Sequence, residues 1–251
     1  MDLGLKDKVA LITGAGSQTG FGKGMALALA REGCDLVVCD MDIAGAEKTA
    51  EEVRAAGRKA MALKMDITNT SEVADGVKAA LKEFGKIDIL INNAGVGTEP
   101  KPFVESTEAE WDTNININLR GTMNVTKAVL PRMIERKTGR IISMSSTAGL
   151  SGMSTGGVYG AAKAGVTLFT NALAKEVAEY NITVNCMAPG AGATNFHKAS
   201  NFPQESIDQF AKMAEAGMTT TPEELGNVAA FLSSDAARKI NGQCIRVSGL
   251  M

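Results

Sequence analysis

Short apolar runs alternate with amphipathic segments along the whole chain, and this alternation limits the folds open to it. The apolar runs predict strands at 9–13, 35–40, 60–66, 87–92, 140–144, 182–187 and 244–247. Helical patterns lie between them, at 22–32, 44–56, 70–84, 107–136, 158–179 and 221–233. Strands joined by helical crossovers form parallel sheets with helices on both faces. The sequence therefore predicts an α/β protein with a seven-stranded parallel sheet in one doubly wound domain, residues 1–251.

Helix ends carry their own signals. Gly57 and Gly85 are predicted to end the second and third helices, because glycine adopts the left-handed conformation that closes a helix. Ser71 is predicted to open the third helix. Thr221 followed by Pro222 is predicted to open the last one, since proline suits the first helical position.

Residues 190–220 interrupt the alternation. The stretch contains Phe196, His197, Phe202 and Phe210 but no strand pattern. Long insertions of this kind often cover an active site. We predict that it is a substrate-binding insertion within the domain; an ordinary surface excursion is the alternative.

Composition excludes several classes of protein. The chain has 26 basic and 28 acidic residues, which gives no sign of a nucleic-acid partner. No apolar stretch approaches the roughly 18 to 20 residues of a membrane span, and residues 1–8 lack the apolar core of a signal peptide. The four cysteines lie mostly in apolar runs and are interpreted as core residues of a cytoplasmic protein. Because His197 is the single histidine, we expect neither a His-based metal site nor a Ser-His-Asp triad.

A glycine-rich turn, Thr-Gly-Ala-Gly-Ser-Gln-Thr-Gly-Phe-Gly-Lys-Gly at 13–24, follows the first strand and opens the first helix. Glycines let the backbone approach a pyrophosphate, and a helix N-terminus favours negative charge. The turn matches neither G-x-G-x-x-G nor the ending of a P-loop. Its position between strand and helix carries the prediction of a dinucleotide site.

Asp40 ends the second strand, where a carboxylate can accept hydrogen bonds from both ribose hydroxyls and repel a 2′-phosphate. Met41 follows it, and the glycine-rich turn has no basic residue before Lys23. These features favour NAD over NADP. A helix cap or loop acid is the alternative interpretation of Asp40.

Tyr159 and Lys163 are four residues apart, so they share one face of a predicted helix. An ammonium beside a phenol favours the phenolate, so Lys163 together with a positively charged nicotinamide would make Tyr159 a general base near neutral pH. Such pairs are usually surface pairs without a catalytic role. Here the pair follows a buried strand that ends in polar residues at Ser146, and ligands of open parallel sheets bind at such strand ends. We predict that Ser146 hydrogen-bonds the substrate oxygen.

Together these motifs resemble the short-chain dehydrogenase/reductase family over almost the entire chain. Asp66-Ile-Thr resembles the family's acid after strand three, and Asn92-Asn-Ala-Gly95 its motif at the end of strand four. Asn118 resembles the helix asparagine of a catalytic tetrad, and the segment from Pro189 to Thr194 resembles the family's nicotinamide-holding segment.

The resemblance implies a Rossmann fold and a catalytic tetrad of Asn118, Ser146, Tyr159 and Lys163. Lys163 would also hydrogen-bond the nicotinamide ribose, and Asn118 would hold a water that links Lys163 to solvent. The neighbouring Asn114 and Asn116 are expected on the helix surface. The cofactor-binding residues predicted are Gly14, Ser17, Gly20, Phe21, Gly22, Asp40, Met41, Asp66, Ile67, Asn93, Ala94, Gly95, Tyr159, Lys163, Pro189, Gly190, Gly192 and Thr194.

The chain departs from the family pattern in three places. The glycine-rich turn has two extra residues before Gly20. Gly192 stands where the family prefers Val or Ile against the nicotinamide, so side-chain packing there is expected to be lost. Ser248 and Leu250 replace an Asp and a Gly near the end of the chain.

We therefore expect an NAD-dependent oxidoreductase that interconverts a secondary alcohol and a ketone, with Tyr159 as general acid/base. The candidate substrate walls are Val96, Met153, Met187, Phe196 and Phe202. A sugar-type polyol dehydrogenase and a 3-oxoacyl carrier reductase are alternatives; Asp40 weighs against the second, because biosynthetic reduction in the family commonly uses NADPH. A non-catalytic nucleotide-sensing protein is an alternative of another class. The family commonly forms homotetramers through its two long helices, here 107–136 and 158–179.

Overall fold

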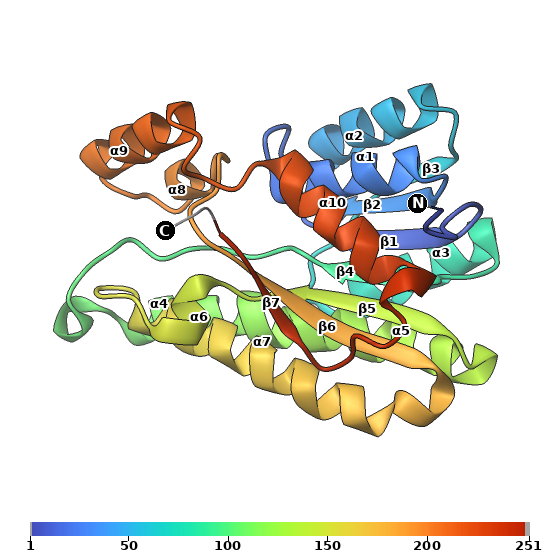
Figure 1. Ribbon diagram of the computed structural model, residues 1–251. Helices are drawn as coiled ribbons and strands as arrows, with labels where there is room; N and C mark the ends of the chain where they lie inside the picture. Colours follow the sequence, from blue (N-terminus) through green and yellow to red (C-terminus); the bar gives the residue numbers. More distant parts are fainter. Residues whose placement is uncertain (1, 249–251) are drawn as a thin grey trace.

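A seven-stranded parallel sheet forms the centre of the computed structural model, which describes residues 2–248 (Figure 1). The spatial order of the strands is β3-β2-β1-β4-β5-β6-β7. Every neighbouring pair is parallel. The strands are β1 (Val9–Thr13), β2 (Asp35–Asp40), β3 (Ala60–Lys64), β4 (Ile89–Asn92), β5 (Gly139–Met144), β6 (Ile182–Pro189) and β7 (Cys244–Val247). The predicted doubly wound α/β fold is confirmed.

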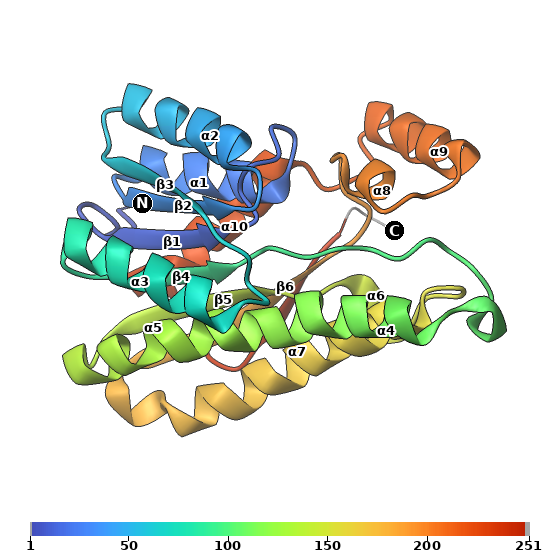
Figure 2. The ribbon, with the colours of Figure 1, turned by 180° about the vertical axis from the view of Figure 1, so that it is seen from behind.

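Helices cover both faces of the sheet (Figures 1 and 2). One face packs against α1 (Phe21–Arg31), α2 (Ile43–Ala55) and α10 (Pro222–Ser233). The other packs against α3 (Thr70–Phe84), α5 (Thr122–Arg136) and α7 (Gly157–Glu176). Alternate residues of a strand point to opposite faces, so Ala10 and Ile12 join the first layer of core while Val9 and Leu11 join the second.

The helix ends mostly follow the predicted signals. Gly57 and Gly85 adopt positive φ angles of 82° and 75° after α2 and α3. At α10, the side chains of Thr221 and Glu224 form a capping box. The prediction for α3 is wrong: its N-cap is Asn69, whose side chain accepts hydrogen bonds from the backbone N–H groups of Ser71 and Glu72. Asparagine is as good an N-cap as serine, so the hydroxyl carried no decisive signal.

The predicted helix at 107–136 is continuous but not uniform. It consists of α4 (Glu108–Asn114), a π-helical segment η2 (Ile115–Gly121) and α5. A π-helix adds a residue to the turn and is frequent at functional sites. Asn118 lies within this segment and is fully buried. Three short helical turns complete this part of the description: η1 (Phe103–Glu105), η3 (Ala178–Tyr180) and η4 (Asp235–Ala237).

The strand order reverses between β1 and β4, because the chain builds β2 and β3 on one side of β1 and then returns to the other. In open α/β sheets, this switch point forms a crevice at the carboxyl ends of the strands. The glycine-rich turn follows β1 there and residues 93–95 follow β4. Both predicted motifs therefore border one crevice.

Residues 190–220 form a helical cover over the same end of the sheet. They contain α8 (Phe196–Ala199) and α9 (Gln204–Glu215), which lie together at one end of the sheet (Figure 1). Residues of both helices and of α6 (Thr147–Ser151) line one cavity. The segment is fixed at its base, where Ala193 N–H donates to Thr220 O at 3.0 Å. It is fixed again where Gly97 N–H donates to Ser200 Oγ at 3.0 Å.

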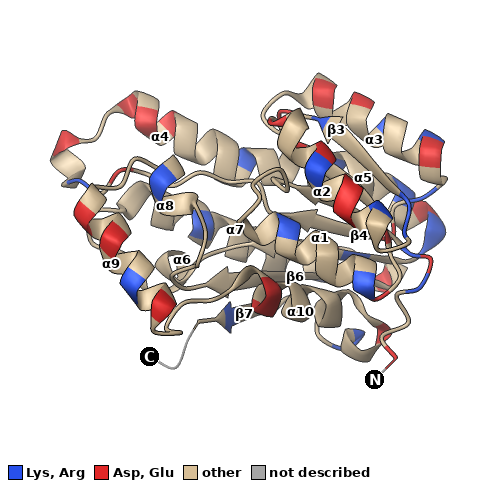
Figure 3. Cartoon of the chain, turned by 90° about the horizontal axis from the view of Figure 1, so that it is seen from above, with Lys and Arg blue, Asp and Glu red and all other residues tan. Residues whose placement is uncertain are grey.

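Acidic and basic side chains are interspersed over the surface helices, for example along α9 and α2 (Figure 3). This mixed surface agrees with the near-balanced composition. Among residues 2–248, no helix has the length and apolar character required to traverse a bilayer.

Candidate active site

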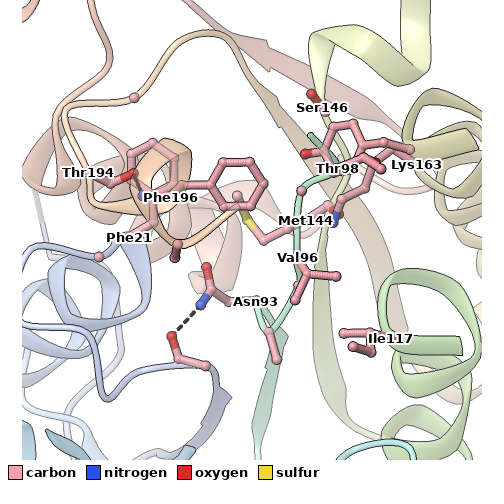
Figure 4. Close-up of a pocket in the computed structure, with 18 of the residues that line it drawn as sticks. Phe21, Asn93, Val96, Thr98, Ile117, Met144, Ser146, Lys163, Thr194 and Phe196 are labelled. Carbon is pink, nitrogen blue, oxygen red and sulfur yellow. Dashed lines mark hydrogen bonds between the residues drawn. The ribbon is translucent and has the colours of Figure 1, made fainter. Parts of the chain in front are cut away.

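A single large cavity of about 1240 Å³ lies at the carboxyl ends of the strands, beneath α8 and α9. Figure 4 shows Ser146 and Lys163 on one side of it and Phe21 and Thr194 on the other. Nearly all the predicted site residues line this cavity. The exceptions are Gly22 and Asn118, which lie directly behind the lining. The predicted motifs are thus brought together in space, although they come from eight separate parts of the chain.

Two glycines of the glycine-rich turn are required by close backbone approach. Gly14 has φ of 68°, and a Cβ there would lie 2.6 Å from Ala94 Cα. A Cβ on Gly22 would lie 2.3 Å from the carbonyl oxygen of Gly14. Any larger residue at either position would push the turn away from the end of β4, so the two glycines allow the turn to pack closely there.

The two extra residues of the turn are held by a side chain that the sequence did not mark. Gln18 Nε2 donates to the carbonyl oxygens of Gly16 at 2.8 Å and Gly45 at 3.0 Å. Its Oε1 accepts a hydrogen bond from Lys23 Nζ at 3.0 Å. Gln18 therefore fastens the longer turn to α2, and Ser17, Gly20 and Phe21 still face the cavity.

Asp40 lies where the sequence predicted it, at the end of β2 and facing the cavity. Its Oδ2 accepts from Gly16 N–H at 2.7 Å and its Oδ1 from Asp42 N–H at 3.0 Å. The helix-cap alternative does not hold, because Asp42 caps α2. Asp40 thus holds the turn in shape while its carboxylate remains beside the cavity, and the exposed Met41 flanks it.

The end of β4 is locked to the end of β1 by polar contacts. Thr13 Oγ1 accepts from the N–H groups of Asn93 and Ala94, both at 3.1 Å. Asn93 Nδ2 donates to Gly14 O at 2.7 Å. Thr13 is a supporting residue that sequence reasoning did not single out. Farther along the cavity, Asp66 Oδ1 accepts from Thr68 N–H at 2.8 Å, and Ile67 lies beside it.

Tyr159 and Lys163 lie one turn apart on α7, as predicted. Lys163 Nζ is 5.8 Å from the centroid of the Tyr159 ring and donates to Met144 O at 2.9 Å. Burial lowers the pKa of Lys163 to about 8. Burial also raises the pKa of Tyr159 above its ordinary value, while a hydrogen bond with Ser146 acts in the opposite direction.

Burial is the main influence on the pKa of Tyr159 in the protein alone. The expected phenolate requires Lys163 together with a positively charged nicotinamide. Two groups are buried together, and desolvation penalises the charged form of each. A phenolate at this site therefore needs a further positive charge next to Tyr159.

Ser146 follows β5 and caps α6. Its Oγ accepts from Ala148 N–H at 3.2 Å, which leaves the hydroxyl proton available to another acceptor. The short helix and the end of β5 thus fix the hydroxyl at the cavity wall, close enough to Tyr159 for the hydrogen bond noted above.

Asn118 joins the π-helical segment to the loop after β4. Its Nδ2 donates to Val96 O at 2.9 Å, and its Oδ1 accepts from Val96 N–H at 3.1 Å. A Cβ on Gly95 would lie 2.7 Å from Asn118 Oδ1 and 3.2 Å from Lys163 Nζ. The prediction for Asn114 is wrong: it is 2% exposed and its Oδ1 accepts from Asn118 Nδ2 at 3.2 Å. Asn114 is the last residue of α4 and lies four residues before Asn118, so the two asparagines share one face of the helix and both point inward.

Pro189, Gly190, Gly192 and Thr194 all line the cavity after β6. The space beside Gly192 is filled by the ring of Phe21, whose Cζ would lie 2.4 Å from a Cβ at that position. Side-chain packing at this point is therefore supplied from the glycine-rich turn. In the C-terminal tail, Ser248 Oγ accepts from Arg246 Nε at 3.0 Å, whereas Leu250 lies outside the described residues.

The predicted substrate walls are mostly found in place. Val96, Met153, Phe196 and Phe202 line the cavity, together with Met144, His197 and Phe210. Met187 is wrong: it is fully buried in the core between the sheet and α1. In β6, alternate side chains face opposite layers, and the apolar pattern of a strand buried on both faces does not show which residue reaches the cavity.

Comparisons with known proteins agree with this geometry. A family model described as short chain dehydrogenase matches residues 8–205. A 3-oxoacyl-[acyl-carrier-protein] reductase of Synechocystis sp. is 40% identical, with 98% of each chain covered. Among solved structures, levodione reductase superposes with a TM-score of 0.90 at 32% identity, with 97% of each chain covered. A 3-ketoacyl-(acyl-carrier-protein) reductase of Brucella melitensis, solved with NADH, gives a TM-score of 0.88 at 36% identity, with 98% of each chain covered.

The fold and the site define a dinucleotide-dependent oxidoreductase of the Rossmann type. The chain belongs to the short-chain dehydrogenase/reductase family. Its cavity fits the cofactor of that family: glycines clear the backbone for a pyrophosphate, and the Asp40 carboxylate stands at the end of β2 for the ribose hydroxyls. NAD is consistent with the NADH bound to the relative from Brucella melitensis. No cluster of three or more metal-ligating side chains occurs within residues 2–248.

Proposed function

We propose that this protein is an NAD-dependent oxidoreductase that interconverts a secondary alcohol and a ketone. The observation that carries the proposal is that Tyr159, Ser146 and Lys163 line the same cavity as Asp40. A hydride acceptor bound along the crevice from Asp40 would end beside the Tyr159 hydroxyl. Residues 190–220 would then close over the substrate.

Each polar group of the tetrad has a defined task in this proposal. Tyr159 takes the alcohol proton during oxidation and returns it to the ketone oxygen during reduction. The Ser146 hydroxyl donates to the substrate oxygen and positions it. Lys163 is anchored by Met144 O, and its remaining protons can reach a ribose and a water. Asn118 holds the backbone of Val96, and thereby the loop after β4 that lies beside Lys163.

The cofactor supplies hydride transfer and, in its oxidised form, a positive charge. That charge would counter the effect of burial on Tyr159, whose pKa is raised in the protein alone. The preference for NAD is proposed from Asp40, because a carboxylate there repels a 2′-phosphate. The residues between 14 and 42 that line the cavity beside Asp40 include no Lys or Arg.

The substrate half of the cavity favours an uncharged compound. Of the lining residues at 94–98 and 144–210, only Lys163 is a Lys, Arg, Asp or Glu. Aromatic and methionine side chains share this wall with hydroxyl and amide side chains, those of Thr98, Ser145, Ser146, Thr147, Ser151, Thr194 and Asn195. A polyol could pair its hydroxyls with these groups, so the polyol alternative remains open.

Titration of the purified protein with NADH and NADPH, followed by a screen of secondary alcohols and ketones, tests the proposal. We expect tighter binding of NADH and ketone-dependent NADH oxidation. Tighter binding of NADPH would remove the role assigned to Asp40. Nucleotide binding without turnover of any alcohol or ketone would favour the nucleotide-sensing alternative.

A 3-oxoacyl carrier reductase is the second candidate, and a specific observation favours it. The relative from Synechocystis sp. carries that name at 40% identity, and the Brucella melitensis reductase of this kind was solved with NADH. The argument that Asp40 weighs against this function is therefore weakened. Reduction of an acetoacetyl thioester at a higher kcat/KM than that of simple ketones would select this candidate.

We also propose a cytoplasmic homotetramer. Val125 and Val129 are buried within the chain, but Leu168 on the outer face of α7 is 70% exposed, which suits a helix that packs against a second copy. The four cysteines are free thiols, as a reducing compartment would keep them. Light scattering coupled to gel filtration would test the assembly, and Leu168→Glu is expected to dissociate it, whereas Lys78→Glu on the exposed side of α3 is the control.

A further inference from the structure

An aromatic cluster of Phe196, His197, Phe202 and Phe210 joins α8 to α9 and lines the cavity. His197 stacks on Phe210 with ring centroids 3.6 Å apart and an interplanar angle of 10°. It meets the edge of Phe202 at 5.1 Å. The cluster accounts for the shape of the cover, but apolar rings alone would serve that purpose. A histidine inside it needs a separate reason.

The imidazole of His197 has no partner for its polar atoms. Neither ring nitrogen hydrogen-bonds to any other residue between 2 and 248. Neither nitrogen is among the fully buried polar atoms of those residues that lack a hydrogen-bond partner, so both nitrogens are accessible to solvent. Burial lowers the pKa of His197, which keeps the ring neutral with one N–H donor and one nitrogen acceptor.

The cluster begins beside the ring of Tyr159. The centroid of the Phe196 ring is 6.0 Å from that of the Tyr159 ring, and the centroid of the His197 ring is 6.0 Å from that of Phe196. Phe196 is therefore the neighbour of both the Tyr159 ring and the His197 ring. A flat ring that lies against Phe196, with its ketone at Tyr159, would place a group on its far side near His197.

We propose that His197 is a specificity-determining residue that hydrogen-bonds a second, uncharged polar group of a ring-containing ketone or alcohol. Flat rings suit a wall of Phe196, Phe202 and Phe210, because aromatic faces and edges attract one another. An uncharged group suits this half of the cavity, where Lys163 is the only charged lining residue. This inference rests on the proposed alcohol and ketone activity and adds the class of substrate to it.

The test compares two ketones that differ in one group: 4′-(hydroxymethyl)acetophenone and 4′-ethylacetophenone, with 2-octanone as a ring-free ketone. We expect the wild type to prefer the hydroxymethyl compound by about tenfold in kcat/KM, which is the effect of one hydrogen bond. His197→Phe keeps an aromatic ring but removes both nitrogens, so the ratio should fall to about one. Lys198→Gln changes the exposed neighbour on α8, which does not line the cavity, and should keep the ratio.

Two results would overturn the inference while leaving the proposed function intact: equal kcat/KM for the two aryl ketones in the wild type, or an unchanged ratio in His197→Phe. Equal losses on both compounds in His197→Phe would show that the imidazole only packs the cover. Failure of the wild type to reduce any of the three ketones, although NADH binds, would instead reject the alcohol and ketone activity itself, and this inference with it.

Discussion

The ring of Phe21 occupies the space beside Gly192, where a Cβ would lie 2.4 Å from Phe21 Cζ. Phe21 is the first residue of α1 and belongs to the glycine-rich turn, whereas Gly192 belongs to the segment after β6. The two residues thus connect the nucleotide end of the cavity to the cover formed by residues 190–220. A large side chain at position 21 with glycine at position 192 fills this space. A large side chain at 192 with a small one at 21 would fill it equally well.

Gly192→Val should therefore clash with Phe21 and displace the segment that borders the nicotinamide region. We expect NADH affinity to fall by about tenfold, which corresponds to about 1.4 kcal/mol. The double variant Phe21→Ala, Gly192→Val should recover most of this loss, because it restores the volume. Fluorescence titration of NADH with both variants measures the coupling. Additive losses would show that the contact is incidental.

Tyr159→Phe removes only the hydroxyl and keeps the ring that packs 6.0 Å from Phe196. General acid–base catalysis typically contributes about 10²- to 10⁴-fold, so ketone reduction should fall by at least a hundredfold. NADH binding should remain, because the site of the adenosine half is distant from the change. A rate within threefold of the wild type would contradict the assigned role.

The pKa of Lys163, lowered by burial from 10.5 to about 8, predicts how stability depends on pH. Between these two values the unfolded chain binds more protons than the folded protein, so the free energy of unfolding rises with pH. Relative to Lys163→Met, the stability of the cofactor-free wild type should increase by up to about 3 kcal/mol from pH 8 to pH 10.5. Urea unfolding of both proteins across this range is the measurement. A flat difference would mean that Lys163 is well solvated.

Asp40→Asn tests the choice of cofactor by removing the charge. It keeps one of the two oxygens that accept from Gly16 N–H at 2.7 Å and Asp42 N–H at 3.0 Å. We expect NADH binding to weaken about tenfold and NADPH binding to strengthen, because the charge that repels the 2′-phosphate is removed. Asp42→Asn, two residues later at the N-cap of α2, is the matched control. Unchanged discrimination in Asp40→Asn would place the selectivity elsewhere.

Periodicity and short motifs were enough to predict much of this protein from its sequence. Alternating apolar and amphipathic segments specify a parallel sheet, because helical crossovers leave few other ways to bury both kinds of segment. The motifs around Asp40, Asn93 and Ser146 follow strands, and parallel strands bring their carboxyl ends to one edge. The positions of these motifs at strand ends were therefore enough to predict most of the residues that line the cavity.

Only the tertiary structure decided the remainder, because it depends on contacts between distant segments. The π-helical form of the segment around Asn118, the brace that Gln18 forms with Gly45, and the contact of Phe21 with Gly192 leave no periodic signal. Met144 and Met187 are paired in neighbouring strands, but β5 ends at Met144 whereas β6 continues to Pro189, so Met144 reaches the cavity and Met187 stays in the core. Likewise, burial and not sequence spacing sets the protonation of Tyr159 and Lys163, since desolvation depends on everything that surrounds a group.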